Sequence, residues 1–135
     1  MRCVLDCSSA VAWYFDDEAS QNSERLLAAI LKDGAVVPCL WRTEFVNVLV
    51  TAERRRRITA VKRREILRDA ESLPISVDQT APSLAHLADL ATEYRLTAYD
   101  AAYLELAQRL ALPLATRDRD LIKAAKAGGI RLFCG

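Results

Sequence analysis

The chain has 135 residues, of which 52% are hydrophobic and 27% charged, and its formal net charge is +1. This length and balance are typical of a single globular domain with a sizeable core, and they exclude a disordered chain. No apolar run approaches the ~18 residues of a membrane span, and Asp6 interrupts the first apolar stretch too early for a signal peptide. We therefore expect one cytoplasmic domain over residues 1–135.

The N-terminal half alternates between short apolar strands and helices with an apolar stripe. A strand is predicted in RCVLD, then a helix in SERLLAAILKD that a glycine ends, then a second strand in AVVP. Two further helices are predicted over about residues 40–52 and about residues 60–73. No repeat, low-complexity tract or flexible linker interrupts this order.

The C-terminal half continues the alternation. Its predicted elements are, in order, a strand at ISV, a helix from Pro82 to Tyr94, a helix containing Asp100, a strand at LPLAT, a helix over about residues 118–127 and, after a GG stop, a strand at IRLFC. Short strands separated by helices predict right-handed crossovers and a parallel sheet with helices on both faces. The expected fold class is α/β, a three-layer α/β/α domain with a central parallel sheet of about five strands.

Two acidic residues follow predicted strands. Asp6 ends the first strand and Asp118 comes two residues after LPLAT. Ligands of an open parallel sheet bind beyond the carboxyl ends of its strands, so acids at these positions are candidates for a binding site. Either one could instead cap the helix that follows, which is worth about 1 kcal/mol. Taken singly, each acid is better explained as a cap.

Two more acids lie on helix faces that the pattern predicts to be buried. Asp100 shares its stripe with Tyr103, Leu104 and Ala107. Thr97 and Asp100 also fit a capping box, which would account for this acid. The stripe of Glu44 is mostly apolar and consists of Leu40, Trp41, Asn47, Val48 and Thr51. The capping box does not account for Glu44.

The helix that contains Asp100 also has a polar stripe, which consists of Glu105, Gln108 and Arg109. Glu105 and Arg109 have the spacing of a solvent-facing ion pair. We therefore expect this stripe to face water and the stripe of Asp100 to face the protein.

If the four acids converge at the carboxyl edge of the sheet, their charges need a partner. Carboxylates close to one another repel and raise one another's pKa, so such a cluster persists when something positive neutralises it. Mg²⁺ or Mn²⁺ accepts carboxylate oxygens, retains waters and binds substrate phosphate oxygens. The chemistry that this site implies is phosphodiester hydrolysis.

Four segments resemble the acidic motifs of PIN domains, in particular the VapC-type toxins of type II toxin–antitoxin pairs. In chain order they are VLDCSSAVAWYF, WRTEFVNVL, LTAYDAAYLELA and LATRDRDL. The resemblance covers essentially the whole chain. It implies a Mg²⁺- or Mn²⁺-dependent endoribonuclease that acts as a toxin, with RNA as its substrate. It also implies a homodimer and an antitoxin whose tail enters the acidic groove.

The same resemblance assigns roles to individual residues. The acidic quartet of catalytic residues and metal ligands consists of Asp6, Glu44, Asp100 and Asp118. Three supporting polar positions beside these acids are Ser8, Asn47 and Thr116. Asp120 could be an outer-sphere ligand, but a first-turn acid favoured by the helix dipole is the preferred interpretation.

Residues 53–68 concentrate positive charge. The segment contains eight Lys and Arg residues and only two acids, Glu53 and Glu65, so its net charge is +6. The segment is either a solvated tip between two helices or a site that attracts RNA phosphates. The cysteines, in contrast, lack a C-x-x-C pair and indicate reduced structural thiols; they are Cys3, Cys7, Cys39 and Cys134.

Two other classes of function compete with a nuclease. The first is a nucleic-acid-binding or protein-binding module that has the fold without the chemistry, and metal binding would separate it from an enzyme. The second is a receiver-like or phosphatase-like domain in which Asp6 is phosphorylated. That class calls for a second acid two residues later, where this chain has Ser8.

Overall fold

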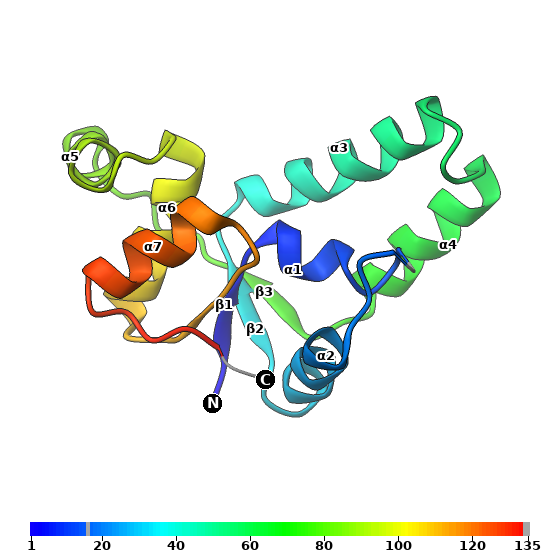
Figure 1. Cartoon of the computed structure of the whole chain (residues 1–135), viewed down its shortest axis with the longest axis horizontal. Helices are drawn as coiled ribbons and strands as arrows, with labels where there is room; N and C mark the ends of the chain where they lie inside the picture. Colours follow the sequence, from blue (N-terminus) through cyan, green and yellow to red (C-terminus); the bar gives the residue numbers. More distant parts are fainter. Residues whose placement is uncertain (16, 134–135) are drawn as a thin grey trace.

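The computed structural model describes residues 1–15 and 17–133 (Figure 1). The elements follow the predicted alternation of strands and helices. They are β1 (Cys3–Leu5), α1 (Cys7–Val11), α2 (Gln21–Asp33), β2 (Ala35–Val37), α3 (Leu40–Arg54), α4 (Ala60–Glu71), β3 (Ile75–Val77), α5 (Leu84–Tyr94), α6 (Ala98–Leu110), β4 (Leu114–Ala115) and α7 (Arg119–Ala127).

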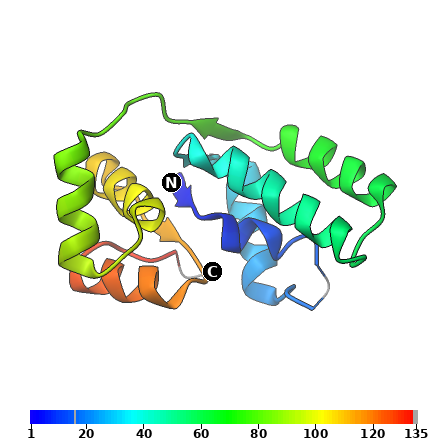
Figure 2. The same ribbon diagram turned by 90° about the horizontal axis from the view of Figure 1, so that it is seen from above.

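The sheet has four parallel strands in the order β3-β2-β1-β4. Every residue of β1, β2 and β4 is buried, as expected of parallel strands with helices on both faces. The helices α5, α6 and α7 form one group and α1 to α4 the other, with the strands between them (Figures 1 and 2). The expected α/β architecture with a parallel sheet is therefore confirmed.

The expected number of about five strands is not matched. The segment predicted as the last strand contributes an isolated bridge, in which Leu132 pairs with Leu114 of β4. Two hydrogen bonds accompany it, from Leu114 N–H to Arg131 O and from Phe133 N–H to Leu114 O, each 2.9 Å long. β4 has only two residues, so it offers too short an edge for a full ladder. Cys134, in the predicted strand, lies outside the described residues.

Helix boundaries depend on caps that the predictions placed only approximately. α2 begins two residues early because Ser20 and Ser23 form a reciprocal capping box. α5 begins at Leu84 instead of the predicted Pro82, because Ser83 provides the N-cap. α1 is a five-residue helix that the predicted order of elements did not contain; the sequence suggested it only as the helix that Asp6 could cap.

The expected exposure of Glu105 is wrong. Its side chain is only 5% exposed, and Arg109 covers it with a hydrogen bond of 2.8 Å. Arg109 also binds Asp78, which follows β3, at 2.7 Å. Helical spacing placed the pair correctly, but it contained no information on the neighbouring segments that cover this face.

The three cysteines in the described chain are free thiols. Cys3 and Cys7 are buried, and Cys39 is exposed. Burial raises the pKa of Cys3 to about 11 and that of Cys7 to about 12. The buried pair therefore stays protonated and packs as small apolar side chains.

Candidate active site

The strand order places the candidate site at one point of the sheet. From β1 the chain moves outward to β2 and β3, and it then returns across the sheet to β4 on the other side of β1. The strand order reverses between β1 and β4, and ligands of open α/β sheets bind at such a switch point, beyond the carboxyl ends of the strands. Asp6 follows β1 here, and Thr116 follows β4.

Asp6 is the most deeply buried of the four acids. It is 6% exposed, and its Oδ2 accepts hydrogen bonds of 2.7 Å from both Ser8 Oγ and Thr116 Oγ1. It occupies the N-cap position of α1, but its side chain makes no capping bond, so the capping interpretation is wrong for Asp6. Burial raises the pKa of Asp6, the two hydroxyl groups lower it, and the charge of Asp118 raises it again.

Asp118 is the N-cap of α7, as one of the two interpretations predicted. Its Oδ2 accepts a hydrogen bond of 2.9 Å from Leu121 N–H. Its own N–H donates to Thr116 Oγ1 at 3.0 Å, so Thr116 links Asp118 to Asp6. The cap fixes the carboxylate close enough for its charge to raise the pKa of Asp6 and of Asp100.

Glu44 reaches the site from α3 and meets α6. Its Oε1 accepts a hydrogen bond from the hydroxyl of Tyr103, which is fully buried. Burial raises the pKa of Glu44, the Tyr103 bond lowers it, and the charge of Asp6 raises it. A buried tyrosine hydroxyl needs a polar partner, and here that partner is a predicted site residue.

Asp100 completes the cluster from the first turn of α6. Its pKa is raised to about 6, first by burial and then by the charges of Asp118, Asp6 and Glu44. Its backbone N–H donates to Thr97 Oγ1 at 3.1 Å, so Thr97 is the N-cap that the capping-box pattern predicted. Asp100 is therefore part of the N-terminal cap of α6, and the charges of the other three acids also act on its carboxylate.

The four carboxylates lack a positive partner in the described chain. No basic nitrogen of residues 1–15 and 17–133 lies within 4.0 Å of any of them. Nor, among these residues, are three His, Cys, Asp or Glu side chains already gathered as a metal site. The carboxylates of Asp6, Glu44 and Asp118 accept hydrogen bonds from local donors, and a hydrogen bond with the Thr97 side chain lowers the pKa of Asp100. An all-oxygen donor set with unbalanced negative charge nevertheless fits a hard divalent cation.

The supporting residues differ in where they lie. Ser8 and Thr116 contact Asp6 directly, and Ser8 Oγ also accepts the Arg117 N–H at 3.0 Å. Asn47 is exposed on α3, and its side chain makes no hydrogen bond within the described part of the chain. Asp120 is exposed in the first turn of α7, where an acid favours the helix dipole.

Sequence reasoning missed the roles of Tyr103 and Arg117. Tyr103 was assigned to an apolar stripe, although its hydroxyl had to be satisfied on burial. The contribution of Arg117 comes from its backbone, which no side-chain pattern reveals.

Comparison with known proteins agrees with the fold. The PIN domain family model matches residues 3–127. The crystal structure of PAE2754 from Pyrobaculum aerophilum superposes with a TM-score of 0.70 at 25% identity, covering 92% of this chain and 84% of that one. Curated proteins gave no match. No helix in the described residues is long and apolar enough to cross a membrane. With a family model that spans nearly the whole sequence, the chain belongs to the PIN domain family, whose members are generally nucleases.

Proposed function

We propose that the protein is a divalent-metal-dependent endoribonuclease that hydrolyses RNA phosphodiester bonds. The observation that carries this proposal is the convergence of Asp6, Glu44, Asp100 and Asp118 from four separate segments. Burial and then the charges of Asp118, Asp6 and Glu44 raise the pKa of Asp100, and no basic nitrogen of the described chain lies within 4.0 Å of any of the four carboxylates. Such an arrangement costs stability unless a positive group joins it.

The cofactor that fits is Mg²⁺ or Mn²⁺, held by these four carboxylates. When bound, the ion would supply positive charge at the phosphate and lower the pKa of a water nucleophile. The chain's own residues prepare the ligands: Ser8 and Thr116 orient Asp6, and Tyr103 orients Glu44. Preset ligand positions lower the cost of assembling the site.

The exposed tip of the α3–α4 hairpin supports RNA as the substrate. Arg54, Arg55 and Arg56 are exposed there. Arg57 is exposed as well, but it pairs with Asp17 at 3.2 Å and lies over the ring of Phe15. The guanidinium groups of the other three have no carboxylate within 4.0 Å among the described residues and can approach a phosphate backbone.

The toxin role, the homodimer and the antitoxin rest on the resemblance to VapC-type toxins, whereas the cytoplasmic location rests on the sequence pattern alone. The electrostatics of the site are compatible with an antitoxin arginine. A guanidinium forms charge-assisted, bidentate hydrogen bonds with carboxylates, so it could neutralise this cluster in place of a metal. An antitoxin tail of this kind would inhibit the enzyme by occupying the ligands.

The test is cleavage of an end-labelled RNA by purified protein. Wild type with Mn²⁺ is expected to give internal cuts that EDTA abolishes. Asp100→Asn is expected to lose activity while remaining folded. Asp120→Asn is the matched control, because it removes an exposed acid from α7 and should cut normally. Failure of wild type to cut with any divalent metal, or equal cutting by Asp100→Asn, would refute the proposal.

The toxin role requires a separate experiment in cells. Induced wild type is expected to arrest growth, and Asp100→Asn is expected to be harmless at the same protein level. Arrest by both proteins would show that the effect does not depend on the acidic cluster.

A further inference from the structure

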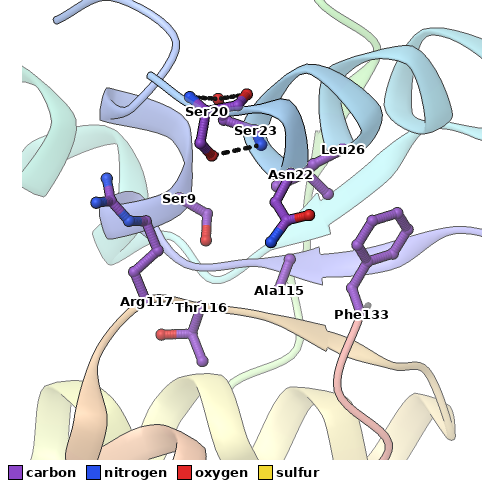
Figure 3. Close-up of a pocket in the computed structure, with 9 residues that line it drawn as sticks. All are labelled: Ser9, Ser20, Asn22, Ser23, Leu26, Ala115, Thr116, Arg117 and Phe133. Carbon is purple, nitrogen blue, oxygen red and sulfur yellow. Dashed lines mark hydrogen bonds between the residues drawn. The ribbon is translucent and has the colours of Figure 1, made fainter. Parts of the chain in front are cut away.

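A cavity of about 320 Å³ lies beside the acidic cluster and is not used by the chemistry proposed above. It is open to solvent on one side and is bordered by α1, the first turns of α2, the connection from β4 to α7, and Phe133 (Figure 3). This volume falls at the lower end of the range for small-molecule sites. It is therefore large enough for one small ligand group.

The cavity and the cluster share part of their framework. Thr116 lines the cavity and donates its hydroxyl hydrogen to Asp6. Arg117 also lines the cavity, and its N–H donates to Ser8 Oγ, which itself binds Asp6. A ligand in the cavity would consequently lie one residue away from the carboxylate that is central to the cluster.

Ser9 places a hydroxyl group in the wall of the cavity. It is 5% exposed and lines the cavity from α1. Its hydroxyl has no hydrogen-bond partner among the described residues, whereas the hydroxyls of Ser20 and Ser23 satisfy each other's backbone groups across the capping box (Figure 3). The Ser9 hydroxyl is accessible from the cavity, so it is available to hydrogen-bond a ligand there.

The remaining walls combine an amide with apolar surface. Asn22 extends from α2 toward the cavity, and Phe133 lies at one side (Figure 3). The backbone N–H of Phe133 binds Leu114 O at 2.9 Å, which fixes this residue beside β4. Leu26 adds a second apolar contact. The cavity thus offers donors and acceptors next to an aromatic face.

The charge of the lining argues against a simple anion site. Arg117 is the one charged residue among those that line the cavity, and its guanidinium lies 3.5 Å from Glu18. An anion would have to compete with this carboxylate. An uncharged planar group with polar edges matches the walls better.

We propose that this cavity binds one nucleobase of the RNA strand, next to the phosphodiester at the acidic cluster. The inference rests on the proposed ribonuclease function and deepens it. Unpaired bases are recognised by stacking on aromatic side chains and by hydrogen bonds to their edges. Phe133 supplies the first kind of contact, and Asn22 with Ser9 supplies the second. The cavity would then select which nucleotide flanks the cut.

The test is a titration of ¹⁵N-labelled wild type with the four nucleoside 5′-monophosphates in EDTA, with inorganic phosphate as a separate titrant. The amide signals of Ser9 and Asn22 are expected to shift, with different affinities for the four bases. Asn22→Ala and Ser9→Ala are each expected to weaken binding by roughly tenfold, the size typical of losing one contact to a base edge. Gln21→Ala is the control, because Gln21 is exposed, precedes Asn22 on α2 and does not line the cavity.

Thermal unfolding separates a ligand site from a structural role. Ser9→Ala is expected to weaken nucleotide binding without lowering the melting temperature, since the Ser9 hydroxyl makes no hydrogen bond within the described residues whose loss would destabilise the fold. A lower melting temperature with unchanged binding would overturn the proposal.

Two other outcomes would also overturn it. The first is that inorganic phosphate reproduces the nucleotide shifts, and the second is that nucleotides leave these amides unmoved. The RNA cleavage assay with Mn²⁺ is read separately. Cleavage by wild type without nucleotide binding refutes the base pocket alone, whereas loss of both refutes the ribonuclease function as well.

Discussion

Replacing Asp100 by Asn should stabilise the metal-free protein at neutral pH. The folded protein raises the pKa of Asp100 from 3.8 to about 6. A pKa change of one unit corresponds to about 1.4 kcal/mol, so this rise corresponds to about 3 kcal/mol if it is fully felt. Asp100 is partly exposed, and solvent screening reduces the figure to about 1.5 kcal/mol. The helix dipole favours a negative charge at this position, so replacing Asp100 by Asn loses about 0.5 kcal/mol of stability.

The expected net gain for Asp100→Asn is therefore about 1 kcal/mol at pH 8, or roughly 4 °C in melting temperature for a domain of this size. The pH dependence has a definite sign. Because the folded pKa is above the unfolded one, the contribution of Asp100 to stability is complete below about pH 3.8 and is lost as the pH rises through about 6. The free energy of unfolding of Asp100→Asn should consequently equal that of wild type at pH 4 and exceed it by an increasing amount up to pH 8.

Urea unfolding in EDTA at pH 4, 5, 6, 7 and 8 measures this difference. Asp120→Asn is the control for removing an acid from the first turn of a helix, and it should show no comparable opening with pH. If Asp100→Asn is less stable than wild type throughout, the carboxylate acts as a capping-box acid and the repulsion argument is refuted.

Three further predictions address the neighbourhood of the cluster. Changing Arg55 and Arg56 together to Ala should weaken RNA binding and flatten the slope of log affinity against log salt by about 1.4, measured by fluorescence anisotropy; an unchanged slope would make the tip a solvated surface. Thr116→Val should raise the pKa of Asp6 by removing a donor and move the pH–rate profile of cleavage to higher pH, whereas an unmoved profile would contradict this coupling. Arg109→Ala should destabilise the fold by about 3 kcal/mol in urea unfolding, because it leaves a buried carboxylate on its own helix unpaired, and a loss below about 1 kcal/mol would show that water replaces the arginine.

The sequence contained enough information to predict the order of the elements. Short apolar runs located β1, β2, β3 and β4 to within about two residues. In β1, β2 and β4 this reflects burial on both faces, which leaves continuous apolar stretches in parallel strands. The last predicted strand had the same composition, yet it forms only a bridge at Leu132. The amino-acid composition of a segment does not show whether the neighbouring strand is long enough to pair with it.

The candidate site was predicted in part for a similar reason. Strand-end position drew attention to Asp6 and Asp118, and unexpected polarity on apolar helix faces drew attention to Glu44 and Asp100. The hydrogen bond from Tyr103 to Glu44 joins two helices and leaves no trace in local spacing. The local pattern also suggested a cap for each strand-end acid, and only the tertiary structure distinguished the capping Asp118 from the non-capping Asp6.

Thermal unfolding with and without Mn²⁺ tests most directly the claim that the four carboxylates hold a metal. A ligand that binds only the folded protein stabilises it by about 2.7 kcal/mol at a concentration one hundred times its dissociation constant. Wild type in Mn²⁺ should therefore melt well above wild type in EDTA, and Asp100→Asn should show little or no rise. The absence of a metal effect in wild type, or an equal rise in both proteins, would contradict a metal site at this cluster.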